Sequence, residues 1–134
     1  MNAMVLSRPT ELRGCRVRLA AGPAAPAEAR RQVQAAIRAW DIPVDLDVAA
    51  LLTSELVTNA IRREPGPTVT VAITCSRAEL RVDVHDTSRR LPVLADAPVD
   101  AEAGRGLMLV ATLAADWGVC RDPAGKAVYF TLVF

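Results

Sequence analysis

The sequence predicts an α+β fold, a two-layer α/β sandwich in which a mixed, mostly antiparallel sheet is covered on one face by about three helices. Three observations lead to this class. The composition, with 51% hydrophobic and 23% charged residues over 134 positions, is that of one globular domain with a real core. Runs with a period of two alternate with runs of helical period. Two pairs of the period-two runs are separated by only three residues, which indicates antiparallel hairpins.

The first half of the chain is expected to hold one strand and two helices after a loose tail over residues 1–14. The stretch CRVRLA, residues 15–20, alternates in period two. The next helix is predicted over residues 26–40, because proline is tolerated in a first turn and apolar residues then recur at helical spacing. A second helix is predicted over residues 47–63, which contain no glycine or proline and are followed by Pro65. Residues 15–134 are therefore taken as one domain.

The second half of the chain is expected to hold two hairpins with a long loop and a helix between them. The loop carries two prolines and no sustained period, and loops of this length inside compact domains tend to be functional. The helix GLMLVATLAADW is apolar nearly all round, which predicts that it is buried. The predicted elements are strands over 68–75 and 79–86, a loop over 87–105, a helix over 106–117, and strands over 117–122 and 126–134.

Charge and composition exclude several classes of function. The net charge of +1 and the aromatic content of 4% give neither a basic surface nor a stacking platform for nucleic acid. Cys15, Cys75 and Cys120 form no CxxC pair and no metal-ligand spacing with His85, so we expect reduced thiols. No apolar run approaches the roughly 20 residues that span a bilayer, so we expect no membrane association and a cytoplasmic location.

Two polar residues interrupt the apolar face of the second predicted helix. At 100° per residue, Val48, Leu52, Glu55 and Asn59 fall within about 60° of one another on one stripe. Glu55 and Asn59 therefore extend the apolar face, and we expect them to be buried or to face a cleft. An unpaired amide in such a place costs about 1 to 3 kcal/mol, and an unpaired carboxylate costs more.

Two explanations account for this pair. In the structural one, Arg62 or Arg63 neutralises Glu55 locally. In the functional one, the pair faces a bound ion, water or phosphate, because an amide oxygen is a hard ligand suited to Mg²⁺ and a carboxylate can orient water. The sequence leaves both open.

Asp86 presents a similar choice at the end of a predicted strand. Leu80, Val82, Val84 and Asp86 share one face of that strand, so Asp86 ends an inward-facing row. A carboxylate there can accept a hydrogen bond from an exocyclic amine such as that of a purine. The structural alternative is a turn aspartate that bonds the following backbone. We expect His85 on the other face to have no catalytic role.

The stretch GRGLMLV, residues 104–110, is expected to open the last helix. Gly104 and Gly106 would let the backbone approach a ligand, the N-terminus of the helix would favour a phosphate, and Arg105 adds a cation. A plain connection between loop and helix is an equally good explanation of these residues alone.

Taken together and in this order, SELVTNA, an Asp that closes a strand, GRGLMLV and a final GKAVYF hairpin resemble the histidine-kinase-like ATPase superfamily over residues 15–134. Within it the chain is most similar to short bacterial ATP-binding proteins of the anti-sigma-factor serine/threonine kinase type. The resemblance implies the histidine-kinase-like ATPase fold with ATP and Mg²⁺ as cofactors, Asn59 as the magnesium ligand, Glu55 as general base, Asp86 as the adenine contact and residues 87–103 as a mobile segment. The nucleotide-binding set it implies comprises Asn59, Arg63, Asp86, Ser88, Gly104, Arg105, Gly106 and Leu107.

The resemblance also implies partners and leaves alternatives. Relatives bind a sigma factor, phosphorylate a small antagonist protein and pair as homodimers. This chain departs from their pattern, with Ser88 in place of a glycine, Arg62 and Arg63 in place of a histidine, and Ala127 in place of a hydroxyl residue. One alternative is therefore a partner-switching module without catalysis, with or without ATP. A coenzyme A-dependent acyltransferase is a further alternative, disfavoured because no strand runs directly into the glycines.

Overall fold

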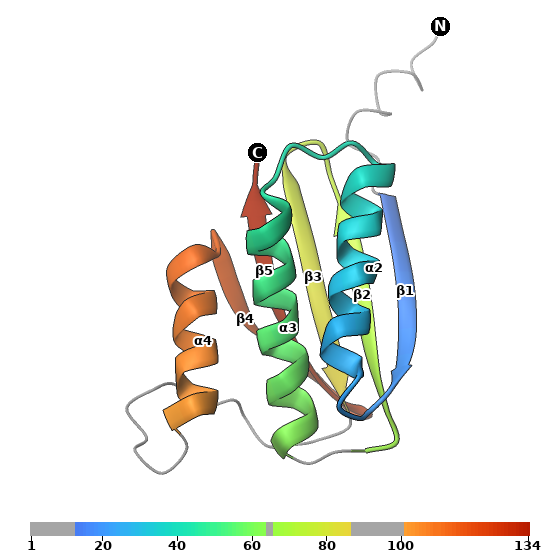
Figure 1. Ribbon diagram of the computed structural model, residues 1–134, viewed down its shortest axis with the longest axis vertical. Helices are drawn as coiled ribbons and strands as arrows, with labels where there is room; N and C mark the ends of the chain where they lie inside the picture. The colour runs from blue at the N-terminus through green and yellow to red at the C-terminus, as the bar shows by residue number, and fades with distance from the viewer. Residues whose placement is uncertain (1–12, 64–65, 87–100) are drawn as a thin grey trace, which may run out of the picture.

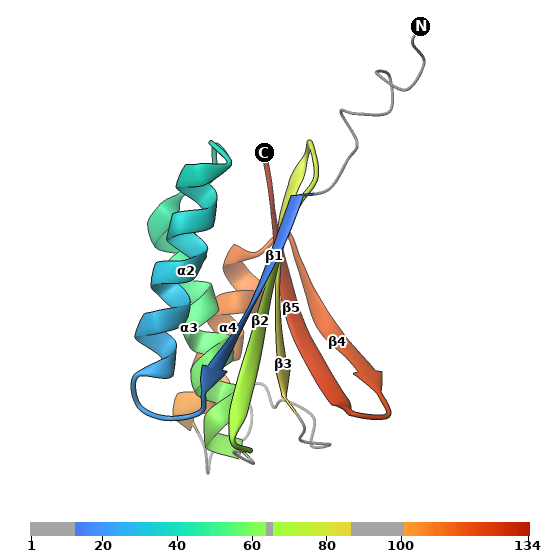
Figure 2. The same ribbon diagram turned by 90° about the vertical axis from the view of Figure 1, so that its right-hand side faces the viewer.

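The computed structural model describes residues 13–63, 66–86 and 101–134, which form a five-stranded sheet with three helices packed on one face (Figures 1 and 2). The strand order is β1-β2-β3-β5-β4, and each pair of neighbouring strands in this sheet is antiparallel. The predicted fold class is confirmed. The elements are β1 (Arg13–Ala20), α2 (Ala25–Ala39), α3 (Leu46–Arg63), β2 (Thr68–Cys75), β3 (Glu79–Asp86), α4 (Ala101–Leu113), β4 (Asp116–Asp122) and β5 (Gly125–Val133).

The described elements follow the periodicity of the sequence closely, with one exception. Strands β2 and β3 have the predicted bounds, and the bounds of α2 and α3 differ from the predicted ones by one residue. The exception is α4, which begins at Ala101 and ends at Leu113. Most of the expected tail and most of the expected loop lie outside the described residues. The last two residues of the expected tail, Arg13 and Gly14, belong to β1.

The prediction that the GRG stretch precedes the last helix is wrong, because Gly104 and Gly106 lie inside α4. A glycine inside a helix costs about 1 kcal/mol relative to alanine, so a glycine pair suggests a boundary in sequence analysis. Here the helix continues through the pair, and its Gly106 and Leu107 are buried. Close packing at these positions offsets the weak helix propensity.

The prediction that α4 is buried all round is also wrong. Met108, Leu109 and Leu113 are exposed, whereas Leu107 and Val110 are buried. Helix α4 lies beside α3 at the end of the helical layer (Figure 1), and its contacts are with α3 and β4. A helix at that place has neighbours on one side only, so its apolar residues cannot all be covered.

The core lies between the helical layer and the inner face of the sheet. Burial alternates along β2 and β3, as expected for strands with one face covered. Helix α3 is central, because it contacts α2, α4 and strands β2, β3 and β5. The largest fully buried side chains include Phe130, Leu52 and Leu56. Side chains on the inner stripe of α3 are therefore held against the middle of the sheet.

The start of α3 is fixed by a side-chain cap. Oδ1 of Asp45 accepts hydrogen bonds from the backbone N–H groups of Asp47 at 2.8 Å and Val48 at 3.0 Å. This is the geometry of an N-cap, which satisfies donors that have no partner inside the helix. None of the helices in the described ranges is both long enough and apolar enough to cross a membrane.

Candidate functional site

The amide of Asn59 is buried with an unsatisfied oxygen. The residue lies on the inner stripe of α3 and is 7% exposed. Its Oδ1 atom has no hydrogen-bond partner among the residues that the structure describes. Buried polar atoms nearly always have a partner, so an orphaned acceptor points to a water, an ion or a ligand. No arginine side chain among the described residues satisfies this oxygen.

Glu55 lies one turn earlier on α3, half-buried, where α3 meets α4. A Cβ atom placed on Gly106 would lie 2.8 Å from Oε1 of Glu55, closer than real Cβ atoms approach an oxygen. Glycine at this position thus leaves room for the carboxylate against the backbone of α4. Glu55 and Gly106, which the sequence analysis singled out and which lie 51 positions apart in the chain, are thus brought into contact.

Asp86 ends the inner row of β3, as expected from the parity of that strand. It is buried, and its backbone partner in the sheet is Lys126 of β5. Nζ of Lys126 lies 2.9 Å from Oδ1 and 3.2 Å from Oδ2 of Asp86. The side chains are 3% exposed for Lys126 and 4% for Asp86. The carboxylate is thus engaged by an internal cation.

Asn59 and Asp86 line the same small cavity between α3 and the sheet. Its volume is about 10 Å³, measured as the space open to the centre of a water molecule. That is room for about one water. The lining residues are Leu56, Asn59, Ala60, Val84, Asp86, Lys126 and Val128. The lining is therefore polar at Asn59, Asp86 and Lys126 and apolar at the other four residues.

Lys126 was missed as a site residue in the sequence analysis, although a signal for it exists. Lys126 shares parity with Val128, Phe130 and Leu132, which are buried on the inner face of β5. A lysine after a turn is usually solvated, so only its place in this row indicates burial. It is also the only lysine in the chain.

The importance attached to Ala127 is not supported by the geometry. Ala127 lies on the other face of β5, where it lines a hollow together with His85. The residue of β5 that reaches Asp86 is its neighbour Lys126. Lys126, and not Ala127, is therefore the residue of β5 that lies at the expected adenine contact.

The remaining predicted residues are placed as follows. Arg63 is the last residue of α3, and Leu107 is buried in α4 next to Gly106. Gly104 and Arg105 lie in α4. Ser88 lies outside the described residues. Arg62 is exposed and has an interaction of its own.

Metal-ligating side chains are not clustered in the part of the chain that is described. No group of three or more His, Cys, Asp or Glu residues there could hold a metal ion. A cation at Asn59 would therefore need further ligands from a bound molecule or from water.

The opposite face of the sheet carries a larger and more polar hollow. Its volume is about 610 Å³, and β1, β2, β3, β4 and β5 all contribute to its lining. Arg16, Arg18 and His85 line it together with Asp83 and Asp122. Figure 2 shows that the helices leave this face uncovered.

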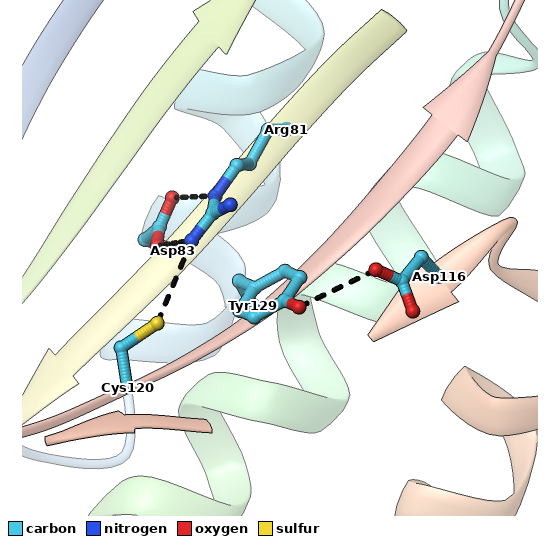
Figure 3. Close-up of polar contacts among 5 residues, drawn as sticks. All are labelled: Arg81, Asp83, Asp116, Cys120 and Tyr129. Carbon is cyan, nitrogen blue, oxygen red and sulfur yellow. Dashed lines mark hydrogen bonds and ion pairs between the residues drawn. The ribbon is translucent and has the colours of Figure 1, made fainter. Parts of the chain in front are cut away.

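A polar network orders the side chains around Arg81 on this outer face (Figure 3). Arg81 donates two hydrogen bonds to Asp83, at 2.9 and 3.0 Å, and its guanidinium lies 3.9 Å from the ring centroid of Tyr129. The hydrogen bonds to Asp83 raise the pKa of Arg81 further above its usual range. Tyr129 in turn donates to Asp116 at 3.3 Å. All of these groups have partners within the network.

The fold and the inner site together are those of one class of domain. In this chain the central helix α3 carries Glu55 and Asn59 on the side that faces the sheet and α4, and α4 contains Gly106. A family model described as "Histidine kinase-like ATPase domain" matches residues 19–132. The chain belongs to this family. Membership gives no support to the acyltransferase alternative.

Comparison with solved structures agrees with this fold. Thirteen chains match, among them the crystal structure of the RsbU and RsbW domains of Rv1364c from Mycobacterium tuberculosis. That match has a TM-score of 0.60 and 19% sequence identity. It covers 90% of this chain and 32% of the other, so this chain spans about a third of that structure. No curated protein matches the chain.

Proposed function

We propose that this protein is an ATP-binding regulator resembling anti-sigma-factor serine/threonine kinases, and that it binds Mg²⁺-ATP beside the inner stripe of α3. The observation that carries the proposal is the orphaned Oδ1 of Asn59, buried at a cavity that also contains Asp86. Family membership supports nucleotide binding as the activity of this cavity.

The phosphate end of the site fits a magnesium ion. The free Asn59 acceptor is an amide oxygen, the kind of hard ligand that Mg²⁺ accepts, and this ion usually completes its coordination with waters and substrate phosphates. When bound, the ion would neutralise charge on the phosphates. The absence of an acidic cluster among the described residues is consistent with a cation that binds together with its nucleotide.

Glu55 is the residue proposed to take a proton from an attacking hydroxyl. Gly106 leaves space for its carboxylate against α4, and Asn59 lies four residues further along the same helix. Both side chains are thus held by the same rigid element. Arg63, Ser88, Gly104, Arg105 and Leu107 are the further residues that we propose bind the nucleotide.

Nucleotide binding can be tested by thermal unfolding with and without Mg²⁺ and ATP, because a ligand that binds only the folded state raises the midpoint. We expect Mg²⁺-dependent stabilisation by ATP that Asn59→Ala removes and Asn59→Asp retains, since a carboxylate keeps a hard oxygen at this position. Leu51→Ala, at an exposed position on α3, is the matched control. An equal midpoint shift in Asn59→Ala and the wild type would refute the role of Asn59.

A non-catalytic, partner-switching module is the second candidate, and the Lys126–Asp86 pair favours it because that pair occupies the expected adenine contact. In either case we propose a cytoplasmic homodimer that acts on transcription through a sigma factor or its antagonist. Incubation with labelled ATP and a candidate antagonist separates the two. Phosphorylation of the antagonist that is absent in Glu55→Gln indicates a kinase, and no labelling above that background indicates the switch.

A further inference from the structure

Lys126 is an unusual residue in this chain. Of its 16 basic residues 15 are arginines, and the single lysine is buried, whereas none of the arginines whose burial the structure describes is. An ammonium group is a compact charge, whereas a guanidinium is a broad planar fork. The cavity beside Lys126 has room for about one further water, so little space is left there for a group larger than its ammonium.

The buried pair has a direct consequence for recognition by Asp86. Nζ of Lys126 lies within hydrogen-bond distance of both carboxylate oxygens. The cavity of about 10 Å³ is far below the roughly 300 to 1,000 Å³ of pockets that hold ligands of drug size. A purine cannot reach this carboxylate while Lys126 stays where it is.

An entering base would also have to compensate a buried negative charge. The exocyclic amine of a purine is neutral, so it supplies a hydrogen bond without the charge that the ammonium provides. Both side chains of the pair are nearly inaccessible to solvent, so water does little to stabilise the carboxylate of Asp86 when a neutral amine replaces the ammonium.

We propose that Lys126 competes with the base of the nucleotide for Asp86 and so determines the affinity for the nucleotide. The base can bind Asp86 only after the side chain of Lys126 has moved away from it. The inference rests on the proposed nucleotide binding and concerns the base end of that site. The affinity for a nucleotide is then reduced by the small fraction of molecules in which the pair is open. A triphosphate without a base avoids this cost, so it should bind nearly as tightly as ATP.

The single lysine allows a direct test, because amine acetylation can report on one side chain. We expect Lys126 to be acetylated about 100-fold or more slowly in the folded protein than in urea, since labelling requires local opening. Saturating Mg²⁺-ATP should raise that rate by about ten-fold or more, and Mg²⁺-tripolyphosphate should leave it unchanged. The α-amino group of the chain serves as the internal reference for reagent activity.

Calorimetric titration of variants provides the second measurement. Lys126→Thr should bind ATP about ten-fold or more tightly than the wild type, with unchanged affinity for tripolyphosphate. This variant removes the buried cation beside the carboxylate of Asp86 and can fail to fold. The double variant Asp86→Asn with Lys126→Thr removes both charges and keeps an amide oxygen for the base, and it should also bind ATP more tightly than the wild type.

The outcomes separate this inference from the proposed function. If ATP binds but protects Lys126 further, or binds more weakly to both variants, Lys126 is a nucleotide ligand and the competitor role is wrong while the proposed function stands. If neither ATP nor tripolyphosphate binds to the wild type or to either variant, both proposals fail. Faster acetylation with ATP together with tighter binding by the variants supports the competitor role.

Discussion

Replacing Lys126 by methionine is expected to destabilise the protein strongly, because it leaves the carboxylate of Asp86 buried without its cation. The two side chains are 3% and 4% exposed, so solvent offers little compensation. Removing one partner of a buried ion pair costs about 3 to 5 kcal/mol. Domains of this size are stable by only about 5 to 15 kcal/mol, so the variant loses a large share of its stability.

The double variant Lys126→Met with Asp86→Leu is expected to recover most of this loss. Replacing both members of a buried pair by apolar residues is often neutral or stabilising, because neither charge then has to be desolvated. The expected coupling between the two positions is therefore several kcal/mol, which a double-mutant cycle measures.

Urea unfolding at neutral pH is the assay. With a slope of about 2 kcal/mol per molar urea, a loss of about 4 kcal/mol lowers the midpoint by about 2 M. Glu28→Gln is the control, because it breaks an exposed ion pair with Arg31 on α2 and should barely change the midpoint. A loss below about 1 kcal/mol in Lys126→Met would refute the burial of the pair and the role built on it.

Two further predictions concern α4 and α3. Gly106→Ala should stabilise the protein by up to about 1 kcal/mol more in a Glu55→Ala background than in the wild type. Alanine has the higher helix propensity in both backgrounds, but in the wild type its Cβ atom would be too close to Oε1 of Glu55, which offsets that gain. Asp45→Ala should lower the free energy of unfolding by about 1 kcal/mol through loss of the N-cap, and Asp45→Asn should retain most of it. Both are measured by urea unfolding.

Each of these predictions has a result that contradicts it. Equal effects of Gly106→Ala in the two backgrounds would mean that Glu55 does not lie against α4. Equal losses in Asp45→Ala and Asp45→Asn would mean that the side chain of Asp45 does not act as a cap.

Much of the fold could be predicted because its determinants are local. The alternation in β2 and β3 fixed both their bounds and the inward direction of Asp86. The start of α4 could not be predicted in this way, because its glycines suggest a helix boundary. The reason for glycine inside the helix is the contact between Gly106 and Glu55, which only the structure shows. Tertiary packing overrides propensity there.

The candidate site was predictable only in part, for a similar reason. The helical stripe indicated that Asn59 faces inward, and parity indicated the same for Asp86. The pairing of Lys126 with Asp86 could not be predicted, because it depends on which residue of β5 lies opposite Asp86. That register joins β3 to β5, two strands separated in the sequence by a loop, a helix and β4. Such register is set by long-range pairing.

The arginines of β1 oppose self-association of the protein in concentrated solution. This strand is at one edge of the described sheet, and long edge strands tend to recruit the backbone of another molecule. Arg13, Arg16 and Arg18 place cations along it. A second copy approaching edge to edge would meet like charge, and that protection weakens as added salt shortens the range of the repulsion to about 3 Å at 1 M. Self-association by β1 should therefore rise with ionic strength.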